Sequence, residues 1–120
     1  MRTARDFLAA ADVEFDAGDA LQGSEKMWGA ASHAVMAVAQ QRGWPFGNHN
    51  ALRTVARRLT AERNDRALLA GFTTAEKFHA NFYHDFMEQG ADFDTSRDVV
   101  REFVTRVLDA VGAGPNGSSG

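Results

Sequence analysis

Residues 66–89 read RALLAGFTTAEKFHANFYHDFMEQ, and this stretch decides the fold class. At 100° per residue, its apolar positions fall on one stripe of a helix. The members of this stripe are Leu68, Phe72, Ala75, His79, Phe82 and Phe86. Such a stripe predicts an amphipathic helix that packs one face on a core, with Gly90 as its expected stop.

The rest of the chain carries the same helical period, and no segment shows the alternation typical of a strand. Asn48 is the expected N-cap of one helix, and Thr95 with Asp98 resembles a capping box at the start of the last. A break at Gly23 or Ser24 stays open. The further helices are expected over about 3–15, 20–42, 48–63 and 94–111.

Length and composition favour one folded domain over residues 1–111. The chain has 120 residues, of which 44% are hydrophobic and 24% charged, so it can bury a core without disulfides or metals. Helices joined by short connections usually pack antiparallel. We therefore predict an all-α, single-domain bundle of four to five helices, mostly antiparallel. The Gly/Ser-rich segment 112–120 is expected to be a flexible tail, either native or an added remnant.

Several function classes are excluded or disfavoured by composition. The chain has no cysteine, which excludes thiol nucleophiles and zinc–thiolate sites. Its net charge of −3 gives no general attraction to nucleic acid or anionic lipid. The longest clean apolar run, 34–39, is too short to span a membrane, and acidic residues interrupt the N-terminal region where a signal peptide would lie. We expect a cytoplasmic protein with no membrane contact.

Polar residues are unusually dense in the second half of the 66–89 helix. Glu76, His79 and Tyr83 follow i, i+3, i+7 spacing and can line one cleft. Asn81 and His84 point elsewhere, toward solvent or a partner. His79 is either a core histidine with a satisfied hydrogen bond or a functional imidazole.

The segment 20–42 is apolar or small nearly all round, which predicts the central helix of the bundle. Lys26 and His33 share one face of it. A buried lysine would need a carboxylate such as Glu76 or an anionic ligand, unless its stem simply packs on Trp28. The candidate polar cleft therefore comprises Lys26, His33, Glu76, His79 and Tyr83.

A second candidate site lies at the start of the third helix. His49 stands at the helix N-terminus, where free N–H groups bind anions, and Arg53 and Arg57 follow on the same helix. These three residues are candidate phosphate contacts. The alternative is a simple cap followed by a solvated face whose arginines pair with acids of neighbouring helices.

Metal and cofactor sites are not predicted. Glu76 and His79 have the Glu-x-x-His spacing of carboxylate-bridged di-iron bundles, but those proteins need the motif on two helices and it occurs once here. Gly43 and Gly47 lack the lysine and hydroxyl residue that complete a phosphate-binding loop.

Taken together, the spaced residues resemble one protein family. The residues that carry the resemblance are Lys26-x-Trp28-x-Ala30-Ala31-x-His33-Ala34-Val35, Gly43-Trp44, His49 with Leu52, and Gly71-Phe72-x-x-Ala75-Glu76-x-x-His79-Ala80-Asn81-Phe82-Tyr83. They resemble the PaREP1-like branch of the HEPN superfamily. The resemblance implies an all-α fold, a homodimer, and a ribonuclease, a toxin–antitoxin component or the partner of a minimal nucleotidyltransferase.

The hallmark of HEPN ribonucleases is an arginine followed by four to six residues and then a histidine. Arg42 and His49 stand at the outer limit of this spacing, with six residues between them that form a Gly-Trp-Pro loop and not a continuous helix. Because this loop separates the two residues, we lean away from an enzyme and favour a binding or accessory module, with RNA or a nucleotide as an implied ligand. A divergent metal-independent ribonuclease using His33 or His79, and a purely structural or interaction protein, stay open as alternatives.

Overall fold

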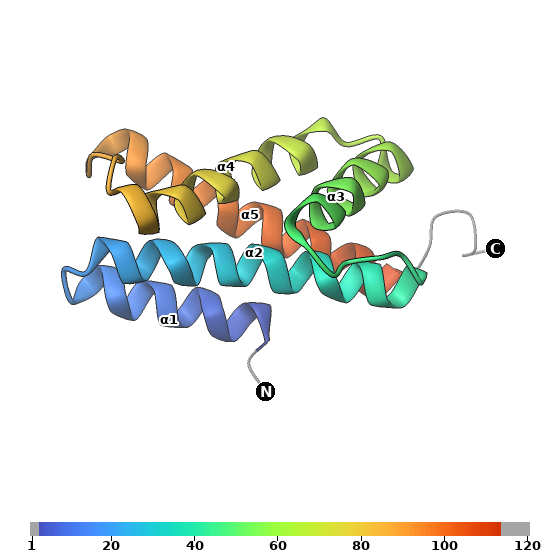
Figure 1. Cartoon of the computed structure of the whole chain (residues 1–120), viewed down its shortest axis with the longest axis horizontal. Coiled ribbons are helices and arrows are strands. Elements are labelled where there is room, and N and C mark those ends of the chain that lie inside the picture. The colour runs from blue at the N-terminus through green and yellow to red at the C-terminus, as the bar shows by residue number, and fades with distance from the viewer. Residues whose placement is uncertain (1–2, 114–120) are drawn as a thin grey trace.

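The computed structural model describes residues 3–113, which fold into helices without any strand. α1 and α2 form an antiparallel hairpin, and α4 and α5 run in opposite directions and pack against α2 (Figure 1). The predicted all-α bundle is confirmed. The helices are α1 (Ala4–Asp16), α2 (Ala20–Arg42), α3 (His49–Arg63), α4 (Arg66–His84) and α5 (Ala91–Ala113).

Local sequence signals set most helix ends. Thr3 caps α1 in a reciprocal capping box with Asp6, and the Asn48 side chain accepts from the Ala51 N–H at the start of α3. α2 runs without a break to Arg42 and is capped by Gly43, whose φ of 72° is the left-handed conformation that glycine adopts without strain. The expected N-cap Asn48 is confirmed.

α2 is the central helix, as predicted, and contacts each of the other four helices. Two glycines let α1 approach it closely: the Phe15 ring lies over Gly23 and the Phe7 ring lies over Gly29. A Cβ at Gly23 would lie 2.4 Å from the Phe15 ring, and one at Gly29 would lie 2.7 Å from the Phe7 ring. Both aromatic rings therefore rest directly on the α2 backbone.

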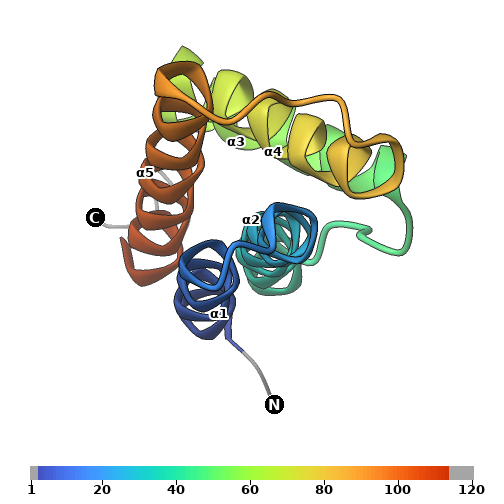
Figure 2. The same cartoon turned by 90° about the vertical axis from the view of Figure 1, so that its left-hand side faces the viewer.

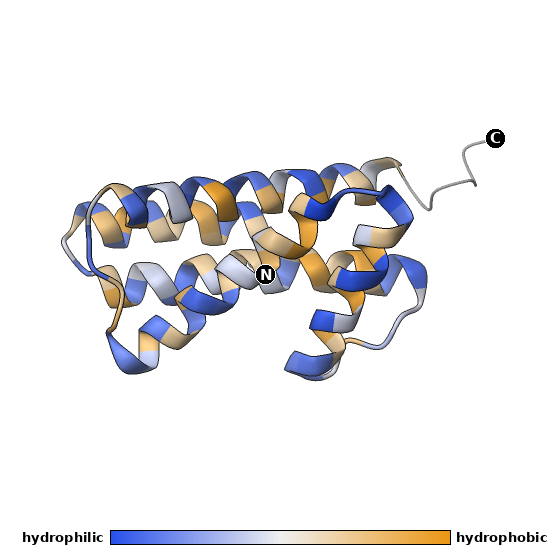
Figure 3. Cartoon of the chain, turned by 90° about the horizontal axis from the view of Figure 1, so that it is seen from above, coloured by the Kyte–Doolittle hydropathy of each residue, from blue (hydrophilic) through white to orange (hydrophobic). Residues whose placement is uncertain are grey.

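α1, α4 and α5 surround α2 (Figure 2), and hydrophobic and hydrophilic residues are interspersed along each helix (Figure 3). Buried side chains from all five helices form the core. Its largest fully buried apolar side chains are Met27, Val35, Val38, Val55, Leu59, Phe72, Phe78, Val100, Val104 and Val107. No helix of residues 3–113 is long and apolar enough to cross a membrane.

Ion pairs connect the ends of the bundle. Arg42, whose side chain is 3% exposed, pairs with Glu62 and joins the end of α2 to α3. Asp12 of α1 accepts from both Arg97 and Arg101 of α5, at 3.1 and 2.6 Å. These ion pairs hold α3 against α2, and α1 against α5.

Arg106 of α5 pairs with two carboxylates. Its guanidinium donates to Glu102 and to Asp65, the residue that caps α4. These hydrogen bonds raise the pKa of Arg106 above its usual value, so it stays a cation. The pair with Asp65 links the start of α4 to α5.

The expected end of the fourth helix is wrong. α4 ends at His84 instead of continuing to Gln89, because Asn81 accepts hydrogen bonds from the Phe86 and Met87 N–H groups. The Asn81 amide also donates to Ser24 Oγ, and the side chain is 1% exposed. Asn81 was expected to face outward, and this too is wrong; His84 is exposed as expected.

The buried face of α4 turns gradually along the helix. Leu68, Phe72 and Ala75 are buried as expected, but Phe78 and Asn81 then take the inward position. Phe86, a predicted member of the stripe, lies beyond the helix and is 53% exposed. Spacing by threes over Phe72, Ala75, Phe78 and Asn81 rotates the inward face relative to a straight stripe.

The expected start of the fifth helix is also wrong. α5 begins at Ala91, directly after Gly90, whose carbonyl accepts from the Asp94 N–H. Asp92 and Asp94 in the first turn favour this earlier start through the helix dipole. Thr95 and Asp98 therefore lie within the helix and form no capping box. α5 continues to Ala113, past the expected boundary, and the rest of the predicted tail lies outside the described residues.

Candidate functional site

Two histidines from different helices lie on Trp28 of α2. The ring centroid of His49, at the start of α3, is 4.9 Å from that of Trp28, and the centroid of His79 on α4 is 4.8 Å away. Both rings are nearly parallel to the indole, at 25° and 26°. Since the histidine centroids are only 5.8 Å apart, the two rings lie side by side over the same face of the indole.

Each of these histidines has its own carboxylate. His49 Nε2 lies 2.7 Å from Glu76 Oε2, and Arg53 pairs with the same oxygen. Because a carboxylate only accepts, His49 donates through Nε2. Glu76 therefore connects α4 to two successive turns of α3 and orients the His49 ring.

His79 faces a different acid. Its Nδ1 lies 3.7 Å from Glu25 Oε2, beyond hydrogen-bond distance. Both atoms are buried from solvent and neither has a hydrogen-bond partner, although the His79 side chain as a whole is 30% exposed. Glu25 is absent from the sequence-based candidates. The signal that could have found it is its i, i+3 spacing from Trp28, which places both residues on the α2 face toward α4.

A shallow groove of about 310 Å³ opens beside the two histidines. Phe46, in the loop between α2 and α3, is 38% exposed at its edge. Trp44 of the same loop packs against the core instead, with Arg58 stacked 4.2 Å from its ring centroid. The groove is lined by Trp28, Ser32, Met36, Phe46, Gly47, Asn48, His49, Leu52 and His79.

The remaining sequence-based candidates lie in varied places. Tyr83 is 66% exposed and meets His79 edge to face at 5.4 Å, so it borders the histidine cluster. His33 instead packs on Phe7 of α1, at 4.6 Å between ring centroids, with its Nδ1 2.9 Å from the Gly29 carbonyl. Lys26 is half-buried, and the carboxylate expected for it, Glu76, is paired with Arg53.

Some residues of the predicted polar cleft lie next to some of the predicted phosphate contacts. Glu76 and His79, predicted as cleft residues on α4, lie next to His49 and Arg53, predicted as anion contacts on α3. Arg57 is exposed one turn further along α3. The structure brings the α3 and α4 candidates together over Trp28, with Tyr83 at the border, and places His33 against α1.

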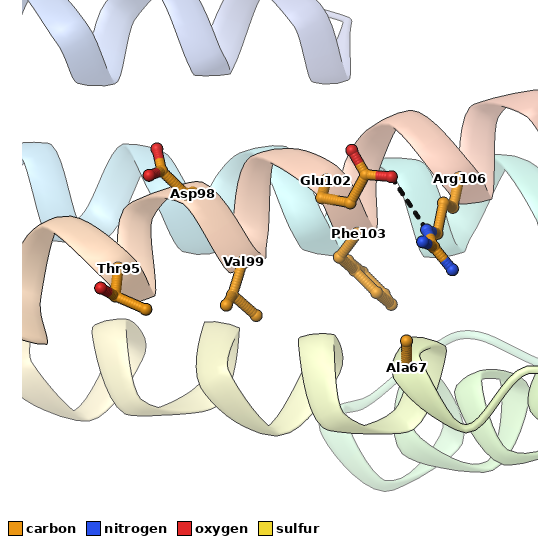
Figure 4. Close-up of a pocket in the computed structure, with 7 residues that line it drawn as sticks. All are labelled: Ala67, Thr95, Asp98, Val99, Glu102, Phe103 and Arg106. Carbon is orange, nitrogen blue, oxygen red and sulfur yellow. Dashed lines mark hydrogen bonds and ion pairs between the residues drawn. The ribbon is translucent and has the colours of Figure 1, made fainter.

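A second concave surface lies between α4 and α5, with a volume of about 290 Å³ (Figure 4). Val99 and Phe103 point from α5 toward Ala67 of α4, while Asp98 and Glu102 point away from it. Of its polar side chains, Glu102 accepts from Arg106. This surface offers mainly apolar contact and has no histidine among its lining residues, so we take the Trp28 groove as the candidate site.

Metal binding finds no support in the part of the chain that the structure describes. No three histidine or acidic side chains of residues 3–113 are placed to hold an ion together. The His49–Glu76 and His79–Glu25 pairs come together through their imidazole rings, and their nitrogen and oxygen atoms do not point at one common position. Each pair places an imidazole nitrogen next to a carboxylate oxygen.

The sequence matches the family model of the archaeal PaREP1/PaREP8 family over residues 1–104. The chain belongs to the archaeal PaREP1/PaREP8 family. The PaREP1 part of the sequence resemblance is therefore confirmed. A comparison of this PaREP1/PaREP8 chain with curated proteins finds no match.

The fold of this PaREP1/PaREP8 chain is similar to that of a solved protein. A crystal structure of a protein from Sulfolobus solfataricus superposes with a TM-score of 0.78 at 16% sequence identity. The match covers 92% of this chain and 98% of the other. At this level of identity the likeness shows a common fold.

Proposed function

We propose that this protein is a HEPN-like binding module that holds a small ligand in the groove beside Trp28. The observation that carries the proposal is the pair of histidines on one face of a buried indole, each with its own carboxylate and each partly exposed. A core that needed only to be filled would not require two half-exposed imidazoles in one place.

The groove favours a ligand with a planar ring and an anionic group. Phe46 offers an exposed aromatic surface at the edge. His49 and Arg53 stand at the N-terminal end of α3, where the helix dipole favours negative charge. A nucleotide, or a nucleotide within RNA, combines these two features. The HEPN resemblance supports the same ligand class, and with it a homodimer and a nucleotidyltransferase partner.

A binding measurement tests this proposal. We expect the wild-type protein to bind 5′-AMP or a short single-stranded RNA in calorimetric titrations, and the His79→Ala variant to bind roughly 2-fold to 10-fold more weakly, since one uncharged hydrogen bond is worth about 0.5–1.5 kcal/mol. His84→Ala is the matched control, because His84 lies on the same helix and is exposed. Absence of binding to the wild type, or equal binding by His79→Ala, would contradict the proposal.

The second candidate function is metal-independent RNA cleavage. The observation that favours it is the 5.8 Å separation of the His49 and His79 rings, which suits one acid and one base acting on neighbouring atoms. We expect a ribonuclease of this kind to cleave RNA in the presence of a chelator and to lose 10²-fold to 10⁴-fold in rate in either His49→Ala or His79→Ala. The same residual cleavage in wild type and both variants would remove this candidate.

A further inference from the structure

The buried contact between Glu25 and His79 has an unusual feature. Glu25 Oε2 and His79 Nδ1 are both hidden from solvent, face each other at 3.7 Å and have no hydrogen-bond partner. Buried polar atoms nearly always have partners, and an unsatisfied pair costs free energy that a slight closure would recover. Hydrogen bonds at functional sites are often long before a ligand binds and shorten in the complex.

Chemistry then decides which nitrogen of His79 holds the proton. The ionised Glu25 carboxylate can only accept, so a bond between them requires a proton on Nδ1. In the neutral ring the other nitrogen, Nε2, must then carry the lone pair. Nδ1 is buried while 30% of the His79 side chain is exposed, so solvent reaches the opposite edge of the ring, which carries Nε2.

His49 provides a contrast within the same site. Its carboxylate partner, Glu76, is bound through Nε2 rather than Nδ1. The two imidazoles on Trp28 are therefore held by different nitrogens, and each neutral ring keeps one acceptor. A ligand that contacts the exposed edge of His79 must supply the proton for that hydrogen bond.

We propose that Glu25 is a positioning residue that fixes the Nδ1–H tautomer of His79 and so presents Nε2 to the groove as an acceptor. The ligand group that contacts His79 is then a donor, a hydroxyl or an N–H group. The identity of the ligand rests on the proposed function, but the tautomer is a property of the protein alone.

Nitrogen-15 NMR of the histidine rings measures the tautomer directly. At a pH where the histidines are neutral, we expect wild-type His79 to show a protonated Nδ1 and an unprotonated Nε2. Glu25→Ala should shift the His79 signals toward the Nε2–H form that free imidazole prefers, and Glu25→Asp should restore part of the Nδ1–H population. Glu76→Ala is the matched control, since it should move the His49 signals and leave those of His79 in place.

Two results would overturn the inference. One is a wild-type His79 in the Nε2–H form, and the other is a Glu25→Ala variant that remains folded with unchanged His79 signals. Failure of the proposed function is a separate result: an Nδ1–H tautomer that depends on Glu25, together with no nucleotide binding, would uphold the role of Glu25 and reject the nucleotide.

Discussion

Asn81→Ala is expected to lower the free energy of unfolding by about 3 kcal/mol. The side chain makes three hydrogen bonds, to Ser24 Oγ and to the N–H groups of Phe86 and Met87, and each such bond contributes about 1 kcal/mol. For a domain of this size the loss corresponds to a fall of roughly 12 °C in the melting temperature. Thermal and denaturant unfolding measure it.

Two further variants separate the parts of this effect. Ser24→Ala removes the buried partner of Asn81 together with the bond from Ser24 Oγ to the Ala20 carbonyl, and should cost about 1–2 kcal/mol while leaving the end of α4 intact. His84→Ala removes an exposed side chain near the same helix end and should change stability by less than about 0.5 kcal/mol. An Asn81→Ala protein as stable as His84→Ala would show that Asn81 does not hold the helix end.

Gly71→Val is expected to destabilise the protein by about 3 kcal/mol, because α4 and α5 touch at this residue. A Cβ built at Gly71 would lie 2.6 Å from Phe103 Cβ, an atom fixed to the α5 backbone that cannot rotate away. The two helices would have to separate, and the 2% exposed Phe103 side chain would lose its packing. Denaturant unfolding measures the loss.

Gly112→Val is the matched control for this substitution. Gly112 also lies in a helix, but a Cβ there meets no atom within 4 Å. Its effect should therefore stay within about 0.5 kcal/mol. Equal losses at the two positions would mean that the cost comes from the backbone preference of valine and not from the contact between helices.

The helical fold could be predicted because its signals are local. The inward stripe of α4, the cap at Asn48 and the stop at Gly43 each depend on residues within a few positions. The end of α4 depends instead on Asn81, whose partners include Ser24, fifty-seven positions away. Nothing in the residues next to Asn81 indicates that contact. The sequence therefore predicts a helix that continues to Gly90, which is wrong.

The candidate site could be predicted only in parts, for the same reason. Helical spacing on α4 correctly places Glu76 and His79 on adjacent turns, and the N-terminal position of His49 is visible in the sequence. That these residues meet over Trp28 depends on how α3 crosses α4, which no spacing within one helix encodes. The sequence also does not say which face of α2 meets α4, so it could not separate His33 from His79. The structure places His33 on Phe7 of α1 instead.

The two glycines of α2 also have a consequence for how the first hairpin is aligned. Phe15 lies over Gly23 and Phe7 lies over Gly29, so at two places in the hairpin a ring of α1 occupies the space that a side chain of α2 would otherwise take. Sliding α1 by about one turn would move these rings onto Met27 and His33, whose side chains occupy that space. Both contacts would be lost at once, so the glycine pair selects a single longitudinal register for the hairpin.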